Sequence, residues 1–541
     1  MKVIKETTNG ANGKTLKRAQ KTSEYPAEKS GNAKFDGLEL EYQRLFDSFK
    51  QNEKNAIRRE DLLGKIAECG ILPTDTRFSG TIKLLDELNV NGSINFEQFK
   101  ELVRRNSHLI KSVVEGRLII PDFPEFRADL IEIYEKVKTN KGGEVASYIP
   151  QLGRVDPKYF AVSVCTVDGQ RFSLGEAQTN FCLQSMSKPV SYCLALEENG
   201  ETEVHKHVGR EPSGRGFNEL TLNNEGLPHN PLINSGAIMM CSLIGRETDL
   251  ADRFDHVSNT WQRLAGGSPV GFNNPVYLSE RQTADRNFAL GYFMREKNAF
   301  PPGTNLVEAL EFYFQCCSIE IDTQSLAVAA ASLANGGVCP TNGDRVFDPR
   351  TVQHCLSLMS SCGMYDFSGE FAFSIGLPAK SGVSGGIMLV VPQVMGIAIW
   401  SPRLDALGNS VRGIEFCREL VRRFNFHAFD SLTTSQNCKR DPRMKKNQVR
   451  IETVVNLCWA ASQGDLDEVQ KLAAAGVDLN AADYDGRTAL HLAASEGHTA
   501  VVSYLLEKRV NPGLVDRWGG TPKSDAERGG HVGTYEILKD Y

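Results

Sequence analysis

The 541-residue sequence has no long uninterrupted apolar run and no excess of basic residues. Its most apolar stretch, Ile387 to Trp400, is interrupted by Pro392 and Gln393 and is shorter than the roughly 20 residues that a membrane-spanning helix needs. We therefore expect no membrane span and interpret this stretch as two buried strands. The formal net charge of -6 gives no basis for binding nucleic acid or an anionic membrane surface.

The cysteines also lack a pattern. The chain has 13 of them, an odd number, without a C-x-x-C pair or a regular framework, which favours reduced thiols in an intracellular compartment over disulfides or a zinc site. The first 34 residues lack the apolar segment of a secretory signal, and with lysines in place of arginines they make a poor mitochondrial presequence. We expect residues 1–34 to be disordered.

Residues 35–120 contain four apolar-periodic segments with short polar connections, which predicts an all-α domain similar to a pair of EF-hands. The segments are Leu38–Lys50, Arg59–Cys69, Phe78–Leu88 and Asn95–Lys111. The best calcium-loop candidate has Gly92 at its sixth and Ile94 at its eighth position, but Glu87 opens it and Gln98 closes it where a bidentate Glu is needed. We therefore expect a structural or assembly role rather than calcium binding.

Residues 121–430 have strand patterns at both ends and helical patterns between them. Apolar residues alternate from Tyr159 to Thr166, and Asp168-Gly169 is a two-residue hairpin signal, so a hairpin is expected there. The strand pattern resumes at Lys380 to Trp400. Strands from the two ends must then meet in one sheet, which predicts an α/β (α+β) core.

The C-terminal part divides into a basic segment and a repeat. Residues 431–450 are polar and basic without periodicity, and we interpret them as a solvated linker. In residues 451–541 a spacing of 33 residues recurs in several registers, including Gly464, Gly497 and Gly530. The segment Asp485 to His498 is similar to the ankyrin motif, so a small all-α ankyrin stack that can bind a protein is expected.

Ser185 and Lys188 form an S-x-x-K motif at the start of an apolar-periodic helix that ends at Gly200. Both side chains lie within one helical turn, as a nucleophile and its proton acceptor must. Alone, the motif is better explained as a capping serine beside a solvated lysine. Lys380-Ser381-Gly382, just before the apolar hairpin, adds the second motif of penicillin-recognising serine acyl-transferases. A peptidase or β-lactam hydrolase is therefore one interpretation.

Further motifs reduce the number of possible enzyme classes, because they occur in a characteristic order and spacing. They are Tyr148–Leu152, Phe181–Lys188, His229–Ile238, Ser279–Asn287 and Cys362–Gly369. Together they resemble the phosphate-activated (kidney/liver-type) glutaminases of animals, over roughly residues 38–541. The resemblance implies a β-lactamase-like catalytic core and hydrolysis of L-glutamine to L-glutamate and ammonia through a γ-glutamyl-serine acyl-enzyme.

The resemblance also assigns roles to residues present in this sequence. It implies Ser185 as the nucleophile, Lys188 as its base and Tyr365 as a second proton-transfer group, with the backbone amides of Ser185 and Val383 as the oxyanion hole. These groups would also contact the substrate, together with the remaining binding positions, which are Tyr148, Asn234, Glu280, Asn287 and Tyr313. Their types fit a free amino acid, since Glu280 can pair with its α-ammonium. Without the resemblance, Tyr313 would be interpreted as a core aromatic and Asn234 as a turn or cap residue.

By the same resemblance we expect a homotetramer in the mitochondrion, with the cytoplasm as the alternative, and no organic cofactor or catalytic metal. Phosphate or another anion would be an activator, yet Glu219 stands where a basic residue is expected in the loop Gly209–Leu222. His205 and His207 are close in sequence but have no third ligand at a suitable spacing, so we expect a solvated pair rather than a metal site.

A non-enzymatic alternative is an ankyrin scaffold whose hydrolase domain is degenerate. Ser185, Lys188 and Tyr365 are all present, which favours an enzyme. Release of ammonia from free glutamine would separate the glutaminase from both the scaffold and the peptidase interpretations.

Overall fold

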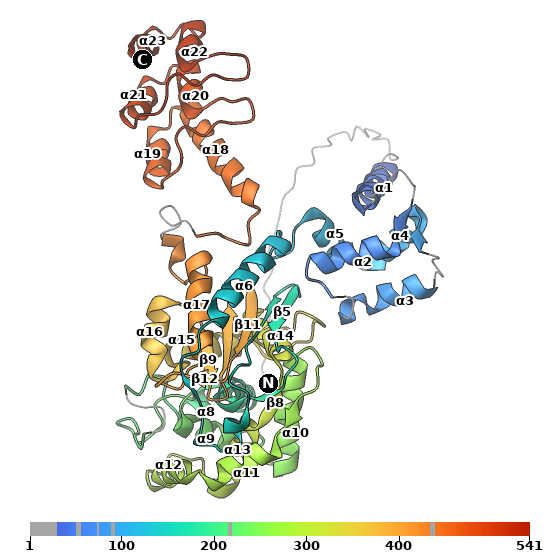
Figure 1. Cartoon of the computed structure of the whole chain (residues 1–541), viewed down its shortest axis with the longest axis vertical. Coiled ribbons are helices and arrows are strands. Elements are labelled where there is room, and N and C mark those ends of the chain that lie inside the picture. The colour runs from blue at the N-terminus through green and yellow to red at the C-terminus, as the bar shows by residue number, and fades with distance from the viewer. Residues whose placement is uncertain are drawn as a thin grey trace, which may run out of the picture.

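The computed structural model describes residues 30–49, 56–72, 75–87, 92–105, 107–214, 219–432 and 439–541. Figure 1 shows a catalytic part with a helical unit at its side and a second helical stack at the C-terminal end. Of the region predicted to be disordered, residues 1–29 lie outside the described residues, whereas residues 30–34 belong to a helix, so the prediction is wrong for these five residues. In the described part of the chain, no helix is both long enough and apolar enough to cross a membrane.

A five-stranded antiparallel sheet with the order β5-β4-β11-β10-β9 is the centre of the catalytic part. The strands are β4 (Ala161–Thr166), β5 (Arg171–Gly175), β9 (Ala379–Gly382), β10 (Gly386–Val391) and β11 (Met395–Trp400). Strand β11 pairs with β4 from Met395↔Thr166 to Trp400↔Ala161, so the two ends of the region share one sheet as predicted. The predicted α/β (α+β) class is confirmed.

Each face of this sheet carries its own hydrophobic layer, because side chains alternate along the strands. Ile387 and Leu389 of β10 pack with α6 (Phe123–Lys138) and α17 (Val411–Arg423), whereas Met388 and Val390 face the larger helical layer. In that layer α14 (Thr323–Ala334) lies directly on β11 (Figure 1).

The larger helical layer and its loops contain the candidate site. Its longer helices are α7 (Lys188–Asn199), α9 (Asn234–Leu243), α10 (Leu250–Leu264), α11 (Asn274–Gln282), α12 (Asp285–Glu296), α13 (Leu306–Cys317) and α15 (Pro349–Cys362). A short sheet that the sequence did not reveal, β6 (Phe181–Cys182), β8 (Ile319–Ile321) and β7 (Gly271–Phe272), joins the segment before Ser185 to the end of α13. It fixes where the S-x-x-K segment enters the layer.

The N-terminal unit has helices in each of the four predicted segments, but the fourth segment contains two of them. The helices are α1 (Ser30–Phe49), α2 (Arg59–Glu68), α3 (Ser79–Glu87), α4 (Phe96–Arg105) and α5 (Ser107–Glu115). Strands β1 (Ile57–Arg58) and β2 (Ser93–Ile94) pair between them, as the loops of two EF-hands do. Part of the candidate calcium loop, residues 88–91, lies outside the described residues.

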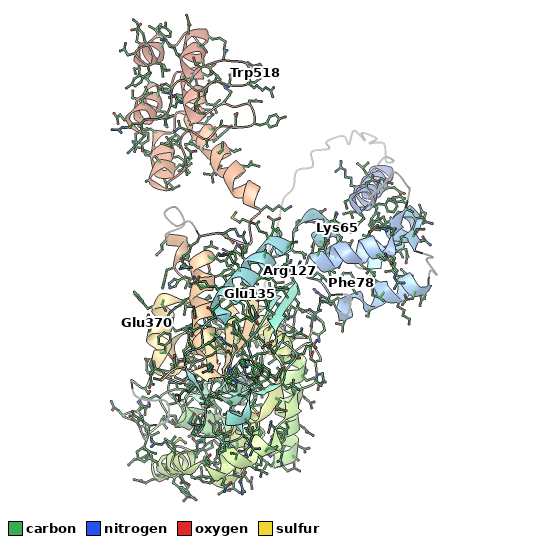
Figure 2. The ribbon with its side chains drawn as sticks, in the orientation of Figure 1. Lys65, Phe78, Arg127, Glu135, Glu370 and Trp518 are labelled. Carbon is green, nitrogen blue, oxygen red and sulfur yellow. The ribbon has the colours of Figure 1, made fainter. Side chains whose placement is uncertain are left out.

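The N-terminal unit is held against the catalytic hairpin. Arg77 Nη1 donates to the carbonyl of Asp168 at 2.8 Å, and Gln170 Nε2 donates to the carbonyl of Cys69 at 2.9 Å. Arg127 of α6, labelled in Figure 2, lines a cavity to which Ala67, Gly70 and Leu72 of this unit also contribute. Because these contacts clamp the β4–β5 turn, the helical unit supports the edge of the catalytic sheet.

The segment predicted as a solvated linker departs from that prediction. Within its described part, Arg440 forms ion pairs with Glu125 and Asp129 of α6, and Lys445 Nζ donates to the carbonyl of Glu115. Helix α18 (Lys446–Gln463) then begins inside the segment. Arg440 therefore fastens this segment to α6, and Lys445 fastens it to the end of α5.

Five further helices form the ankyrin stack together with α18, which pairs with α19. They are α19 (Leu466–Ala474), α20 (Ala489–Ser495), α21 (Thr499–Glu507), α22 (Pro522–Arg528) and α23 (Val532–Leu538). Thr488 and Thr521, which are 33 residues apart, each cap an inner helix through a reciprocal side-chain to backbone pair. Trp518 lies on the loop side of the stack, 64% exposed (Figure 2).

Candidate active site

Ser185 lies in a 3-10 turn, η3 (Gln184–Ser187), that leads directly into α7. The turn is pinned by Ser187 Oγ, which donates to the carbonyl of Gln184 at 2.8 Å. Ser185 is buried, and so is Lys188, the first residue of α7. The prediction that these two side chains lie at the start of one helix is confirmed. Because both are buried, the alternative of a capping serine beside a solvated lysine is wrong.

The Lys188 ammonium group has no carboxylate partner among the described residues. Its Nζ lies 2.6 Å from Oδ1 of Asn234, the first residue of α9. Burial lowers the pKa of Lys188 to about 8, while the nearby Cys317 and Glu280 act in the opposite direction. A lysine held by a neutral amide at this pKa can exchange a proton near neutral pH.

Asn234 connects Lys188 to two other predicted site residues. Its Nδ2 donates to Oδ1 of Asn287 at 3.1 Å, and the hydroxyl of Tyr313 donates to its Oδ1 at 3.3 Å. Asn287 belongs to α12 and Tyr313 to α13, so three helices converge on Lys188. The side-chain network orients Asn234 with its carbonyl toward the lysine.

Tyr365 lies in the turn η4 (Tyr365–Phe367) with a left-handed backbone φ of 54°. Its hydroxyl lies close enough to the Ser185 hydroxyl and to the Val383 backbone amide for both groups to act to lower its pKa. Burial raises the pKa of Tyr365 far above its ordinary value, so the hydroxyl keeps its proton. A non-glycine residue in this conformation carries strain that the surrounding contacts must hold.

Val383 follows β9 in the turn toward β10, close to the nucleophile. A side chain at Gly382 would come within 2.7 Å of the carbonyl of Leu183, so the glycine allows β9 to approach the segment before Ser185. This approach places the Val383 amide beside Tyr365. That this amide and the Ser185 amide form the oxyanion hole stays a prediction.

Glu280 of α11 supplies a buried carboxyl group to the same site. Burial raises its pKa to about 7, against the opposing effects of a hydrogen bond from Gln184 and of the Lys188 charge. Gln184 Nε2 donates to Glu280 Oε2 at 3.2 Å. The backbone of Gln184 has a left-handed φ of 49°. The sequence analysis missed Gln184, although a polar residue directly before a buried nucleophile could have drawn attention to it.

Tyr148 contributes only its hydroxyl end to the site. The residue as a whole is 58% exposed, yet burial raises the pKa of its hydroxyl well above 10, with Tyr365, Glu280 and Cys317 nearby. The exposed fraction is an average over the whole residue, so it is compatible with a buried hydroxyl. All nine predicted site residues thus belong to one connected region.

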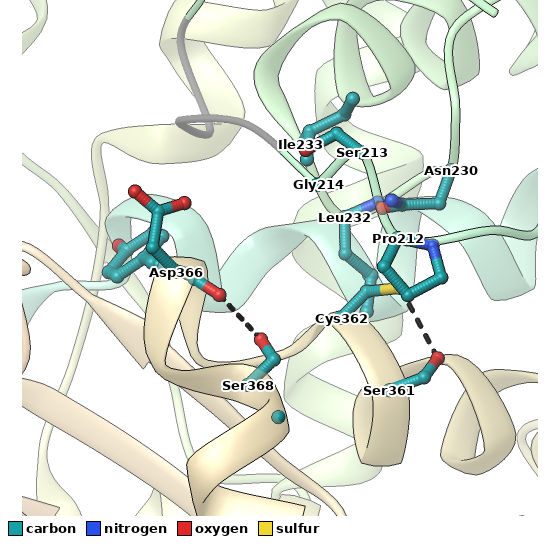
Figure 3. Close-up of a pocket in the computed structure, with 12 residues that line it drawn as sticks. Pro212, Ser213, Gly214, Asn230, Leu232, Ile233, Ser361, Cys362, Asp366 and Ser368 are labelled. Atoms are coloured by element: carbon teal, nitrogen blue, oxygen red, sulfur yellow. Dashed lines mark hydrogen bonds between the residues drawn. The ribbon is translucent and has the colours of Figure 1, made fainter.

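A cavity of about 500 Å³ lies beside Tyr365 (Figure 3). Its walls come from the loop Pro212–Gly214, from Asn230 to Ile233, and from the segment around Tyr365 and Ser368. Burial and the nearby Glu219 raise the pKa of Asp366, which lines the cavity. The loop that contains Glu219 therefore brings negative charge toward Tyr365; residues 215–218 of this loop lie outside the described residues.

The histidine pair was wrongly predicted to be solvated. His205 Nε2 lies 2.9 Å from the hydroxyl of Tyr192, and His207 Nδ1 lies 2.7 Å from the carbonyl of Ala299. Both rings are partly buried, and they tie the segment after α8 (Glu201–Val204) to α7 and to the segment after α12. In the described part of the chain, no group of three His, Cys, Asp or Glu side chains is arranged to hold a metal ion.

Comparisons with known proteins identify the family and the domains of this chain. Residues 143–429 match the glutaminase family, residues 42–121 an EF-hand domain and residues 457–506 ankyrin repeats. The mitochondrial liver isoform of glutaminase from Rattus norvegicus is 48% identical over 85% of this chain and 76% of its own length. A putative glutaminase of Caenorhabditis elegans is 44% identical over 92% of this chain and 87% of its own length. The solved structure of a probable glutaminase matches with a TM-score of 0.54 and 36% identity, over 56% of this chain and 97% of the other.

Proposed function

The chain belongs to the glutaminase family, and we propose that it hydrolyses glutamine through a γ-glutamyl ester on Ser185. It is an amidohydrolase that acts on the side-chain amide of L-glutamine, in a catalytic domain with the β-lactamase-like fold. The observation that carries the proposed mechanism is the lysine one turn from the serine, buried and bonded to a neutral amide rather than to a carboxylate.

In the first step Ser185 Oγ attacks the side-chain carbonyl carbon of glutamine and Lys188 takes the serine proton. With a pKa of about 8, roughly a quarter of Lys188 is neutral at pH 7.5. The tetrahedral oxyanion accepts hydrogen bonds from the backbone amides of Ser185 and Val383, which need no rearrangement at that moment. Catalysis therefore requires no metal-bound water.

The tetrahedral intermediate then collapses. The C–N bond breaks, and the leaving amide nitrogen takes a proton and departs as ammonia. The Tyr365 hydroxyl is protonated and close to Ser185, so it can give its proton to the leaving nitrogen and take in its place the proton that Lys188 received from the serine, which leaves Lys188 neutral. Water then attacks the γ-glutamyl ester and gives a proton to the neutral Lys188, directly or through Tyr365, and this proton returns to Ser185 Oγ as L-glutamate leaves. The atoms balance as glutamine plus water giving glutamate plus ammonia.

The substrate's α-groups are held by the residues around this centre. Glu280 pairs with the α-ammonium, and the hydroxyls and amides of the neighbouring side chains bind the carboxylate and the side-chain amide. These neighbours are Tyr148, Asn234, Asn287 and Tyr313. The buried site favours the zwitterion of a free amino acid over a peptide, because a peptide bond would remove the ammonium that Glu280 needs.

The test of the acyl-enzyme is direct. Acid quenching during turnover should leave one glutamyl group on the peptide that contains Ser185, and Ser185→Ala should abolish this adduct and ammonia release. The variant should still bind glutamine, because the groups that hold the α-ammonium and carboxylate remain. Comparable turnover by Ser185→Ala would exclude the serine mechanism.

Regulation, assembly and location extend the proposal. An acidic Glu219 and Asp366 beside Tyr365 support a weaker dependence on phosphate or another anion than a basic residue there would give.

Exposed apolar side chains on α11 and α12, Leu278 and Tyr292, support a homotetramer contact. The relative's mitochondrial location supports the same compartment here, and the ankyrin stack supports a protein partner.

A further inference from the structure

Lys380 is a second fully buried lysine near the active site, and the proposed mechanism does not use it. It belongs to β9 and has no exposed surface. Its Nζ donates to the carbonyl of Gly363 at 3.0 Å and to its neighbour's carbonyl, that of Ser381, at 2.9 Å. The same nitrogen lies 4.5 Å from the centre of the Tyr365 ring. The contacts with Gly363 and with the Tyr365 ring join Lys380 to the segment Gly363–Tyr365, and the contact with Ser381 lies within β9.

An ordinary core role does not explain this lysine. Among the described residues, Lys380 forms no ion pair with a carboxylate, and both burial and the nearby Lys188 lower its pKa. A methionine of similar length would fill the space without the cost of burying an amine. The position therefore requires a donor of hydrogen bonds.

A direct role as a base does not fit either. Its hydrogens are directed to the two main-chain carbonyls, and Lys188 rather than Lys380 follows Ser185 in the same helical start. Lys380 can therefore affect the reaction only through the residues that it positions.

What it holds is the turn before Tyr365. Gly363 lies against β9 so closely that a side chain there would meet the carbonyl of Ala379 at 1.7 Å. The amide of Ser381 also donates to the Gly363 carbonyl at 3.1 Å, so this carbonyl accepts from both the main chain of β9 and Lys380. Two residues later the chain takes the strained left-handed conformation of Tyr365. Strain of this kind persists only where neighbouring contacts fix it.

We propose that Lys380 is a positioning residue that clamps the Gly363–Tyr365 turn to β9 and so holds the Tyr365 hydroxyl against Ser185 and the Val383 amide. Two main-chain hydrogen bonds fix the start of the turn, and the contact of Nζ with the ring fixes the side chain itself. The inference rests on the proposed function, because it assumes that Tyr365 takes part in proton transfer.

A double-mutant cycle tests this coupling. Lys380→Met and Tyr365→Phe are compared alone and together by kcat at saturating glutamine. We expect each single change to lower kcat at least about tenfold, with KM within about threefold for Lys380→Met, and the double variant to be within about threefold of the worse single variant. A purely structural loss would instead multiply with the loss of the hydroxyl.

Ser381→Ala is the matched control. Ser381 is equally buried on the same strand, its side chain faces the opposite layer, and its Oγ has no hydrogen-bond partner among the described residues. We expect near-normal kcat and an additive effect in the Tyr365→Phe background. Glutamine binding by Ser185→Ala/Lys380→Met, measured by calorimetry, shows whether the altered site is folded.

The outcomes separate this inference from the mechanism on which it rests. If Tyr365→Phe keeps full activity, the role of Tyr365 in the proposed mechanism is wrong. If Tyr365→Phe is impaired but the Lys380→Met loss multiplies with it, or Lys380→Met keeps normal kcat, only the present inference is overturned. Should Lys380→Met fail to fold, Lys380→Gln, which keeps two N–H donors, replaces it in the cycle; failure of both to fold would mean that Lys380 is structural.

Discussion

Lys188 and Glu280 are buried groups of opposite charge whose pKa values approach each other near neutrality, at about 8 and about 7. Burial is the main cause for both, because it disfavours the ammonium of the lysine and the carboxylate of the glutamate. The two groups have opposite tasks in the proposed mechanism. Lys188 must lose its proton to act as a base, and Glu280 must lose its proton to bind an ammonium.

For Lys188 this predicts a turnover that rises with pH. The neutral, active form is present above the folded-state pKa, so kcat should increase through about pH 8 and level off above it. Lys188→Arg keeps the charge but cannot deprotonate, and we expect at least about a 10² loss in kcat. Stopped-time ammonia assays across pH measure both effects. Near-normal turnover by Lys188→Arg together with a dead Tyr365→Phe would make Tyr365 the base.

For Glu280 the prediction concerns binding. Its carboxylate form predominates above about pH 7, so affinity for the substrate ammonium should increase from pH 6 to 8 and binding should release a proton near pH 7. Calorimetry of glutamine binding to Ser185→Ala in buffers of different ionisation enthalpy measures that proton. Glu280→Gln should remove it and raise KM about 10- to 100-fold. Proton release that persists in Glu280→Gln would assign the titration to another group.

For single residues, the sequence identified the functional side chains but not the residues that they contact. Ser185 and Lys188 could be found because one helical turn joins them. The amide that faces Lys188 comes from Asn234, 46 positions along the chain, and its contact depends on the packing of α7 on α9. Gln184 and the contacts of Lys380 were missed for the same reason, since no local pattern indicates which buried polar groups will meet.

At the scale of elements, the turn that presents Tyr365 depends on how closely it lies on β9. Gly363 has an ordinary φ of -80°, so only space restricts this position. Alternation and the hairpin signal were enough to predict that strands from the two ends of the catalytic region meet in one sheet, but not that the sheet has five strands. The split of the fourth N-terminal segment and the short β6-β8-β7 sheet could not be predicted, because strands of two or three residues carry too little pattern.

Gly363→Ala should therefore lower both stability and kcat. The new methyl group would meet two main-chain carbonyls, those of Ala379 and Met359, and neither can move without displacing β9 or α15. We expect a loss of about 2–4 kcal/mol in the free energy of unfolding, measured by denaturant titration.

Gly369→Ala provides the control six residues later. Gly369 lies in α16 (Ser368–Ser374) with open space around it, so alanine should stabilise the helix by about 0.5–1 kcal/mol. If both variants were equally destabilised, the close approach of the turn to β9 would not be the reason for a glycine at 363.

At the scale of the whole molecule, the segment after the catalytic domain is more than a connection. The unexpected ion pairs of Arg440 with α6 show why composition alone was misleading: a basic, aperiodic stretch is solvated only if no acidic surface faces it. The main chain contributes as well, because the Arg440 amide donates to the carbonyl of Arg423 at 2.9 Å and its carbonyl accepts from the Asn425 amide at 3.1 Å. Residues 439–445 therefore belong physically to the catalytic domain.

Two truncations test this division. A chain that ends at Lys445 keeps the ion pairs and the main-chain bonds of Arg440, and it removes only the ankyrin stack, whose helices bury their apolar faces against one another. It should keep most of the turnover. A chain that ends at Leu432 exposes the end of α17 and leaves Glu125 and Asp129 without Arg440, so it should lose about 1–2 kcal/mol of stability, measured by denaturant unfolding, while its kcat at low temperature stays close to that of the longer form. Loss of activity in the chain that ends at Lys445 would mean that the ankyrin stack itself shapes the active site.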